Sequence, residues 1–251
     1  MGKGYLLKKD ESSNIKKEKM NMNSELLIVI PAYNEEENIE NVVTFIQDKY
    51  SQYDYVVVND GSKDKTADIC RQKGYELLNL PVNLGLAGAF QAGLKYAYAK
   101  GYSYAIQFDA DGQHRPEFIE PMLERIKKGY DIVIGSRFIN EKKGSSLRMV
   151  GSKMLTVAIK MTTGVRVADP TSGMRMFSRN MIKEFAQNLN YGPEPDTVSY
   201  LLKNGAKVSE VPVHMDERMA GESYLNLANS AKYMARMLTS ILFVQNFRKR
   251  G

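Results

Sequence analysis

The sequence has few of the residues that build disulfide frameworks and zinc sites. Its 251 residues include one cysteine, Cys70, two histidines and no tryptophan. A lone cysteine cannot form an internal disulfide, which fits a reducing compartment, and no zinc-finger spacing is present. No run reaches the roughly 18 apolar residues of a membrane-spanning helix. We therefore expect a chain that does not cross a membrane by itself.

The composition is that of a globular protein with a basic surface. Hydrophobic residues make up 43% and charged residues 25% of the chain, and the net charge is +6. This length accommodates one large α/β domain with a full core. The positive charge favours acidic partners such as nucleotide phosphates, lipid phosphates or an anionic membrane surface. Nucleic acid is not expected, because the basic residues are scattered and form no recognition-helix pattern.

Apolar runs alternate with helical segments, which predicts an α/β fold with a mostly parallel sheet flanked by helices. The predicted strands cover residues 26–30, 53–59, 75–80, 104–108, 130–136 and 207–213. The predicted helices cover residues 35–50, 64–73, 85–100, 116–128, 150–163, 180–187, 196–203 and 224–247. We expect a disordered tail over 1–24, a catalytic-type domain over 25–223 and an amphipathic helix in 224–251.

Two carboxylates follow the apolar run at 104–108. Asp109 and Asp111 are spaced so that both can reach one cation where a strand turns into a loop. Hard oxygen ligands favour Mg²⁺ or Mn²⁺, which could bridge the two phosphates of a nucleotide. An ordinary Asp-rich turn would give the same local pattern. The polar clusters after the other strands favour the metal, because ligands bind at the carboxyl edge of open parallel sheets.

Seven motifs follow one another in the order and spacing of the family-two glycosyltransferases with the GT-A (Rossmann-like) fold. They are Pro31-Ala32-Tyr33-Asn34-Glu35, Asn59-Asp60-Gly61-Ser62, Asn83-x-Gly85, Asp109-Ala110-Asp111-Gly112-Gln113-His114, Ile134-Gly135-Ser136-Arg137, Asp169-Pro170-Thr171-Ser172-Gly173-x-Arg175 and Glu210-Val211-Pro212-Val213. The last three resemble the polyprenyl-phosphate branch, which includes dolichol-phosphate mannose synthases and bacterial undecaprenyl-phosphate sugar transferases. The resemblance covers residues 26 to about 224.

The resemblance implies a role for each matching residue. The nucleotide-binding residues would be Pro31, Ala32, Tyr33, Glu35, Asp60, Gly85 and Asp109. The metal ligands would be Asp109, Asp111 and Gln113, holding Mn²⁺ or Mg²⁺. The catalytic residues would be Asp169, Arg137, Arg175 and Arg218, and the acceptor phosphate would meet Ser136, Arg137, Arg148 and Arg218. Guanidinium groups suit bidentate phosphate recognition.

Several roles stay open at this stage. Asp60 suits the imino N–H of uracil or guanine, and Gly85 could serve either a turn or a ligand. Asp169 occupies the position proposed as the base in this branch. A phosphate monoester has a second pKa near 6, so at neutral pH much of it is already deprotonated and does not require a base. This carboxylate could therefore orient an arginine or the acceptor instead. Glu194 and Asp196 are rival carboxylates.

The implied reaction is an inverting transfer of a sugar from a nucleotide diphosphate, with a UDP-sugar such as UDP-GlcNAc or UDP-Glc favoured. The acceptor would be a polyprenyl (undecaprenyl) phosphate, met by a peripheral enzyme on the cytoplasmic, inner face of the membrane. Alternatives are a family-two transferase that elongates a glycan on a sugar hydroxyl, and a non-catalytic nucleotide-sugar-binding subunit.

The predicted C-terminal helix indicates how the protein could associate with that membrane. The predicted helix at 224–247 carries an apolar stripe and ends in a basic run, a pattern typical of a helix lying on a membrane, on its own domain or on a partner subunit. We expect membrane contact, with a homo-oligomer and a small membrane-protein partner as further possibilities. The stripe comprises Leu225, Ala228, Ala231, Ala235, Leu238, Ile241 and Leu242.

We also expect Ser62 and Thr66 to stabilise the predicted helix at 64–73.

Overall fold

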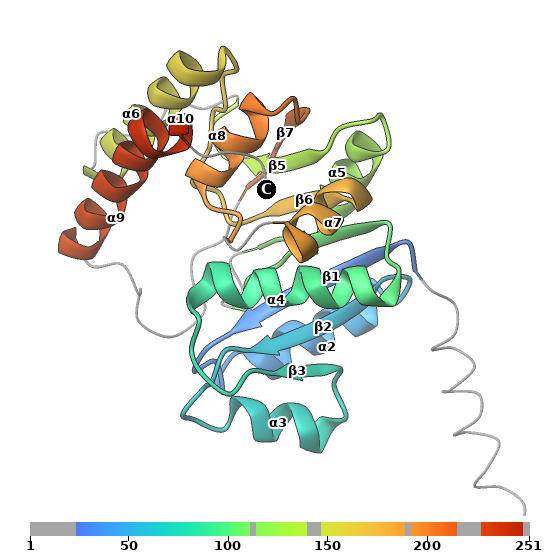
Figure 1. Cartoon of the computed structure of the whole chain (residues 1–251). Coiled ribbons are helices and arrows are strands. Elements are labelled where there is room, and N and C mark those ends of the chain that lie inside the picture. The colour runs from blue at the N-terminus through green and yellow to red at the C-terminus, as the bar shows by residue number, and fades with distance from the viewer. Residues whose placement is uncertain (1–23, 111–113, 140–146, 189–191, 215–226, 248–251) are drawn as a thin grey trace, which may run out of the picture.

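The computed structural model describes residues 24–110, 114–139, 147–188, 192–214 and 227–247 (Figure 1). Within them, seven strands form one sheet in the order β3-β2-β1-β4-β6-β5-β7. The strands are β1 Leu26–Ala32, β2 Asp54–Asn59, β3 Leu77–Asn79, β4 Tyr104–Gln107, β5 Ile132–Ser136, β6 Arg175–Ser178 and β7 Val208–Pro212. All neighbours pair in parallel except β6, which is antiparallel to both β4 and β5. The predicted mostly parallel sheet is confirmed.

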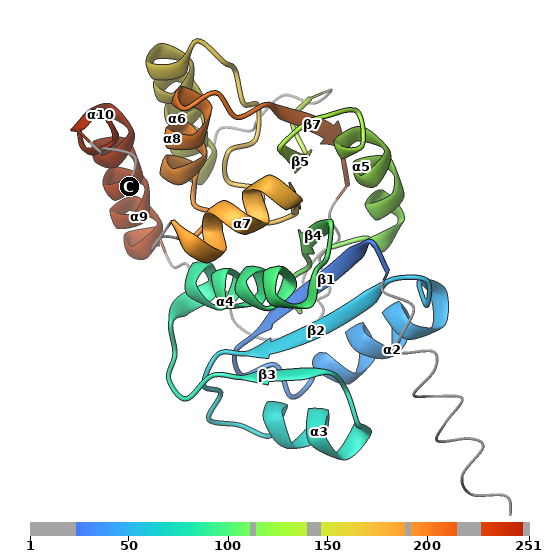
Figure 2. The same cartoon turned by 45° about the vertical axis from the view of Figure 1, so that its right-hand side comes forward.

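Helices cover both faces of the sheet (Figures 1 and 2). One face carries α2 Ile39–Lys49, α3 Thr66–Lys73 and α5 Ile119–Ile126, the last preceded by a short 3₁₀ turn, Pro116–Phe118. The other carries α4 Gly85–Lys100, α6 Leu147–Thr163, α7 Arg179–Gln187, α8 Pro195–Lys203 and α9 Leu227–Thr239. Every residue of β1 is buried, and its side chains alternate between the two hydrophobic cores, as a central parallel strand requires.

Strand β6 is the element that the sequence did not predict. It has four residues, and the preceding cluster, Asp169 to Gly173, is turn chemistry that hides so short a strand. Because β6 runs antiparallel between β4 and β5, it starts where those strands end. The loop before β6 is thereby brought between the ends of β4 and β5, at the edge where ligands bind.

The C-terminal segment packs on its own domain. It runs as α9, a π-helical stretch Ser240–Val244 (η2) and a last turn α10, Gln245–Phe247. Met234, Met237 and Ile241 are buried against the core shared with α6 and α8. Ala231 and Ala235, which we placed on the apolar stripe, are exposed, so this part of the stripe does not pack in the core of the domain. Residues 215–226 lie outside the described part, and the domain boundaries stay predictions.

Candidate active site

The loops after β1 and β2 are bonded to each other at the carboxyl edge of the sheet. The N–H of Asn34 donates to Ser62 Oγ at 3.0 Å, and the N–H of Glu35 donates to Thr66 Oγ1 at 2.9 Å. The N–H of Lys63 returns a bond to Asn34 Oδ1 at 2.9 Å. We expected the two hydroxyls to stabilise α3, but they bind the neighbouring loop. This pairing fixes the loop where we expect the nucleotide.

Asp60 binds a third loop, the one before α4, at the same edge of the sheet. This residue is buried; its N–H donates to Ala32 O at 2.9 Å, and its Oδ1 accepts from the N–H of Leu84 at 2.7 Å. Among the described residues, Oδ2 is then the oxygen that remains to accept a bond from a base. Gly85 begins α4 with φ +74°, a left-handed conformation that accounts for glycine without a ligand.

Asp109 lies just past the end of β4, and its backbone N–H and both carboxylate oxygens each lie close to a polar side chain. Its Oδ1 accepts from Gln107 Nε2 at 2.8 Å, and its N–H donates to His114 Nδ1 at 2.9 Å. Because Nδ1 accepts a bond, a neutral His114 carries its proton on Nε2, which lies 3.5 Å from Asp109 Oδ2. A Cβ on Gly173 would lie 2.7 Å from that same Oδ2. The loop before β6 therefore passes close to the predicted metal-binding carboxylate of Asp109.

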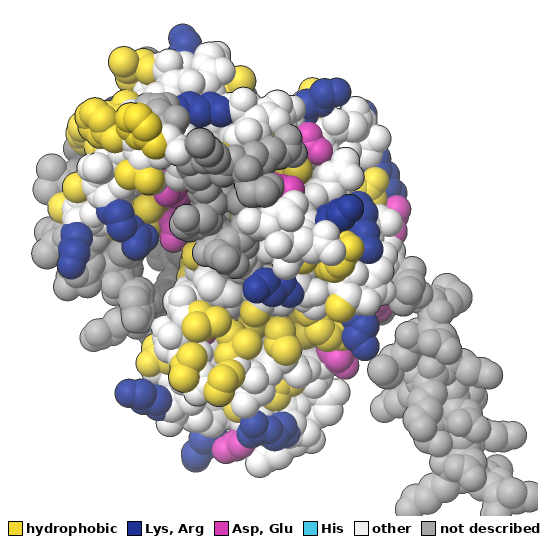
Figure 3. Space-filling model, in the orientation of Figure 1, with side chains coloured by type: hydrophobic (Ala, Val, Ile, Leu, Met, Phe, Trp, Pro, Cys, Tyr) yellow, Lys and Arg dark blue, Asp and Glu magenta, His cyan; other side chains and the backbone are white. Residues whose placement is uncertain are grey.

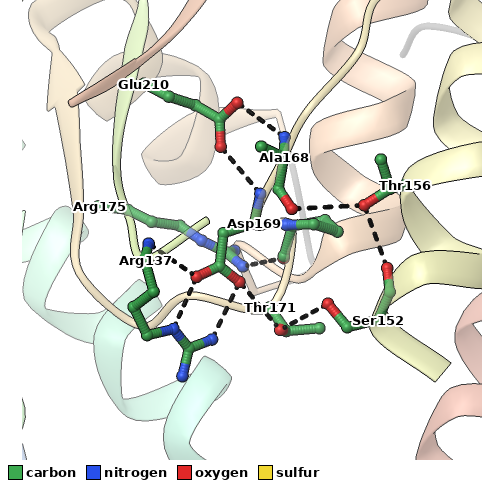
Figure 4. Close-up of polar contacts among 9 residues, drawn as sticks. Arg137, Ser152, Thr156, Ala168, Asp169, Thr171, Arg175 and Glu210 are labelled. Carbon is green, nitrogen blue, oxygen red and sulfur yellow. Dashed lines mark hydrogen bonds and ion pairs between the residues drawn. The ribbon is translucent and has the colours of Figure 1, made fainter. Parts of the chain in front are cut away.

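Arg137, after β5, and Asp169, in the loop before β6, form a two-bond ion pair (Figure 4). Arg137 Nε donates to Asp169 Oδ2 at 2.7 Å, and Nη2 donates to Oδ1 at 2.9 Å. The Arg137 N–H also donates to Oδ2, at 3.2 Å, and Thr171 Oγ1 donates to Oδ1 at 3.2 Å. The Asp169 side chain is fully buried and that of Arg137 is 22% exposed. Asp169 thus accepts four hydrogen bonds.

Glu210 holds the backbone of this loop from the adjacent strand β7. Its two carboxylate oxygens accept the N–H groups of Ala168, at 2.7 Å, and Asp169, at 2.9 Å (Figure 4). Because a bidentate acceptor fixes two successive peptides, the direction of the Asp169 side chain is set by Glu210. The motif containing Glu210 was recognised in the sequence, but nothing in it indicated this role.

Arg175 lies behind the ion pair as a buried charge. Its Nη2 donates to Pro170 O at 2.7 Å and its Nη1 donates to Pro193 O, so it joins the loops before β6 and before α8. Burial lowers the pKa of the Arg175 guanidinium, and the nearby Tyr233 and Glu194 oppose that shift. Its Nε is buried without a hydrogen-bond partner among the described residues. The hydroxyls of Ser136 and Ser172 are buried without partners in the same way.

The two rival carboxylates are bound by the C-terminal segment. Tyr233 Oη donates to Glu194 Oε2 at 2.5 Å, and Ser240 Oγ donates to Asp196 Oδ2 at 2.6 Å. Burial, followed by the charge of Glu194, raises the pKa of Tyr233. Both carboxylates line a cavity of about 680 Å³ between the first turns of α4 and α8 and the C-terminal segment. Sequence reasoning missed Tyr233, because its partner lies 39 residues away.

The remaining predicted residues divide into two groups. Pro31 and Ala32 are buried at the end of β1, followed by half-buried Tyr33 and Glu35. The residues that cannot be placed are Asp111, Gln113, Arg218 and the side chain of Arg148, which lie outside the described part. Within the described residues, no cluster of three or more His, Cys, Asp or Glu side chains could hold a metal. The Asp109 carboxylate still offers the hard oxygen ligands that a divalent cation prefers.

Comparison with known proteins identifies the family. Residues 27–185 match the model described as glycosyl transferase family 2, which is more than half of the chain. The chain belongs to this family. The polyprenol monophosphomannose synthase of Mycolicibacterium smegmatis is 29% identical over 224 residues, which cover 84% of this chain and 84% of that protein. The predicted resemblance to the polyprenyl-phosphate branch is thereby confirmed.

Two further proteins place this family member among its relatives. The UDP-N-acetylglucosamine–dolichyl-phosphate N-acetylglucosaminyltransferase of Methanococcus voltae is 32% identical over 212 residues, 75% of this chain and 84% of that protein. The glucosyl-3-phosphoglycerate synthase of Mycobacterium tuberculosis, solved with Mn²⁺, UDP and phosphoglyceric acid, aligns with a TM-score of 0.65. At 18% identity over 99% of this chain and 85% of that one, the likeness shows the fold alone. The GT-A fold is confirmed.

Proposed function

We propose that this glycosyltransferase moves a sugar from a nucleotide diphosphate to a polyprenyl phosphate, with inversion at the anomeric carbon, at the inner face of the membrane. The close approach of the loop before β6 to Asp109 carries the proposal: a Cβ on Gly173 would lie 2.7 Å from Asp109 Oδ2, so the donor side of the site adjoins the loop that holds Asp169 and, through it, Arg137. The relatives named as polyprenol and dolichyl-phosphate transferases support this acceptor class.

On the donor side, Asp60 and the paired loops would receive the nucleotide. Asp60 Oδ2, which accepts no hydrogen bond from the described residues, suits the imino N–H of uracil or guanine. We favour a UDP-sugar, which the Methanococcus voltae relative names and the Mycobacterium tuberculosis structure supports with its bound UDP. Asp109, together with Asp111 and Gln113, would hold Mn²⁺ or Mg²⁺, which when bound neutralises charge on the departing diphosphate.

On the acceptor side, the exposed part of Arg137 and the hydroxyls of Ser136 and Ser172, which have no partner in the described part of the chain, would bind the lipid phosphate. Arg148 and Arg218 are proposed to complete this site. A phosphate oxygen attacks the anomeric carbon and forms the new C–O bond. The bond from that carbon to the nucleoside diphosphate breaks on the opposite side, and the nucleoside diphosphate leaves with the electron pair. Positioning of the two substrates supplies much of the rate enhancement.

Asp169 serves in this reaction to orient Arg137. Its carboxylate already accepts two bonds from the guanidinium, one from the Arg137 N–H and one from Thr171. Since a phosphate monoester is largely dianionic at neutral pH, the attacking oxygen has no proton that a base must remove. The role that the sequence left open is therefore assigned to positioning.

Elongation of a glycan on a sugar hydroxyl is the less favoured alternative. That reaction needs a general base, and the candidates Glu194 and Asp196 are bonded to Tyr233 and Ser240. Under our proposal, Glu194→Gln retains transfer to polyprenyl phosphate. If the glycan function holds instead, the same substitution abolishes transfer to an oligosaccharide acceptor.

A transfer assay with purified protein tests the proposal. The assay combines radiolabelled UDP- and GDP-sugars one at a time with undecaprenyl phosphate in detergent and follows label entering the lipid phase. We expect one donor to give a lipid-linked product that mild acid releases, as for a glycosyl phosphate. Transfer only to a sugar acceptor would overturn the proposal, and binding of donor without any transfer would support the non-catalytic alternative.

A further inference from the structure

Helix α6 has a second apolar face that the described residues leave exposed. Val150, Met154, Val157 and Met161 follow one another at spacings of four, three and four residues, so they lie in one row along the helix. All four are exposed, from 42% at Val150 to 76% at Met161. A row of exposed apolar side chains on one helix is unusual for the surface of a soluble domain.

The opposite face of α6 already has its partners. Leu155, Ala158 and Ile159 are buried in the core that α6 shares with α9. The exposed row is therefore not needed to hold the helix in the fold. It is a surface on which a molecule or membrane outside the domain can bind.

The charged residues of α6 and of the turn after it all have one sign. Lys153 and Lys160 are exposed on α6, and Arg166 is exposed just past the helix end. The sequence has no acidic residue from 147 to 168. An apolar row on a helix whose charged residues are all cations matches the interface of a bilayer with anionic headgroups.

The C-terminal segment extends this surface. Phe243, Val244 and Phe247 are exposed, Phe247 to 85%, and η2 packs against α6. Figure 3 shows apolar side chains gathered at the upper left of the molecule, where Figure 1 draws α6 and α10. We infer that α6, joined by these C-terminal side chains, is the face that docks on an anionic lipid bilayer.

The docking face is connected to the acceptor side of the site. Ser152 and Thr171 hydroxyls lie 3.3 Å apart, and Thr156 Oγ1 donates to Ala168 O at 3.5 Å (Figure 4). The loop that carries Asp169 is therefore held by the inner face of the helix whose outer face meets the lipid. This inference deepens the proposed function, on whose lipid acceptor it rests, and a bilayer at α6 would present the lipid phosphate beside that loop.

Vesicle sedimentation tests the inference with substitutions that leave the core untouched. The full chain is mixed with vesicles of phosphatidylcholine, with and without phosphatidylglycerol. We expect binding to the anionic vesicles and a loss of about tenfold or more in affinity for both Val157→Asp and Met161→Asp, because each places a charge in the apolar row. Phe45→Asp is the matched control: Phe45 is 48% exposed on α2, across the sheet, and its substitution should change nothing.

Charge and oligomer measurements complete the test. The Lys153→Gln, Lys160→Gln double variant should bind anionic vesicles about 25-fold more weakly at low salt, at about fivefold for each lost cation. If the α6 variants bind as well as the wild type, the docking face lies elsewhere. The wild type could instead fail to bind vesicles and form a dimer in light scattering that Met161→Asp abolishes. In that case the face binds a second copy of the chain, and the inference fails. Vesicle binding without any sugar transfer would refute the proposed function and leave the docking face standing.

Discussion

The Arg137–Asp169 pair gives the sharpest test of how the acceptor site works. Arg137→Ala leaves the fully buried Asp169 carboxylate with only the Arg137 N–H and Thr171 as donors. Breaking a buried pair by removing one partner typically costs about 3 kcal/mol of unfolding free energy or slightly more. The same change removes the proposed contact with the acceptor phosphate, so we expect the KM for lipid phosphate to rise strongly while the KM for nucleotide sugar stays nearly constant. Urea unfolding and two-substrate kinetics measure the two effects separately.

A double-mutant cycle distinguishes positioning from proton transfer. If Asp169 acts by orienting Arg137, Asp169→Asn and Arg137→Ala damage one interaction, and the double variant is hardly worse than either single variant. The coupling energy in kcat/KM for the lipid should then be about 1.5–3 kcal/mol. Strictly additive losses would refute the positioning role, as would a pH profile of kcat that loses its acidic limb only in Asp169→Asn. Arg179→Ala is the control, because Arg179 bonds Tyr102 O at 2.9 Å, away from the site.

Three further changes test the surroundings. Gly173→Ala places a Cβ 2.7 Å from Asp109 Oδ2 and should weaken donor binding about tenfold or more while circular dichroism stays unchanged; an unaffected donor Kd would contradict the contact. Asp111→Asn and chelator should each remove nearly all transfer, with Mn²⁺ or Mg²⁺ restoring the chelated wild type; full activity in chelator excludes metal dependence. Tyr233→Phe frees Glu194 from its hydrogen bond, so we expect a stability loss of about 1 kcal/mol in urea unfolding while transfer to lipid phosphate is retained; a loss of transfer in the folded variant would contradict a purely structural role.

The boundaries of the elements followed closely from local patterns. The helix predicted at 85–100 is α4 with the same ends, because glycine stands at both: Gly85 as its first residue and Gly101 as a left-handed C-cap. The strand predicted at 26–30 continues to Ala32, since Pro31 and Ala32 are equally buried. Strand β6 escaped prediction, because four residues after a turn cluster carry too little periodicity to indicate a strand.

The residue types at the site could be predicted, but their pairings could not. Asp109, Asp169 and Arg137 were singled out from motifs that follow strand ends, and the parallel sheet predicts that strand ends share an edge. That Arg137 would bind Asp169, 32 positions away, depends on the antiparallel insertion of β6. The apolar row of α6 was hidden for a related reason, because a helix with two apolar faces reads in sequence simply as a buried helix.

The sequence by itself determined the family, the mostly parallel sheet and the set of candidate side chains, because these depend on local periodicity and on motifs at fixed spacing. Only the tertiary structure decided that Glu210 fixes the Asp169 loop and that the C-terminal segment binds Glu194 and Asp196. It also decided that α6 presents its free apolar face to solvent. The physical reason is that each of these features depends on which of several possible partners is brought within a few ångströms by packing, and packing is set by all the elements together.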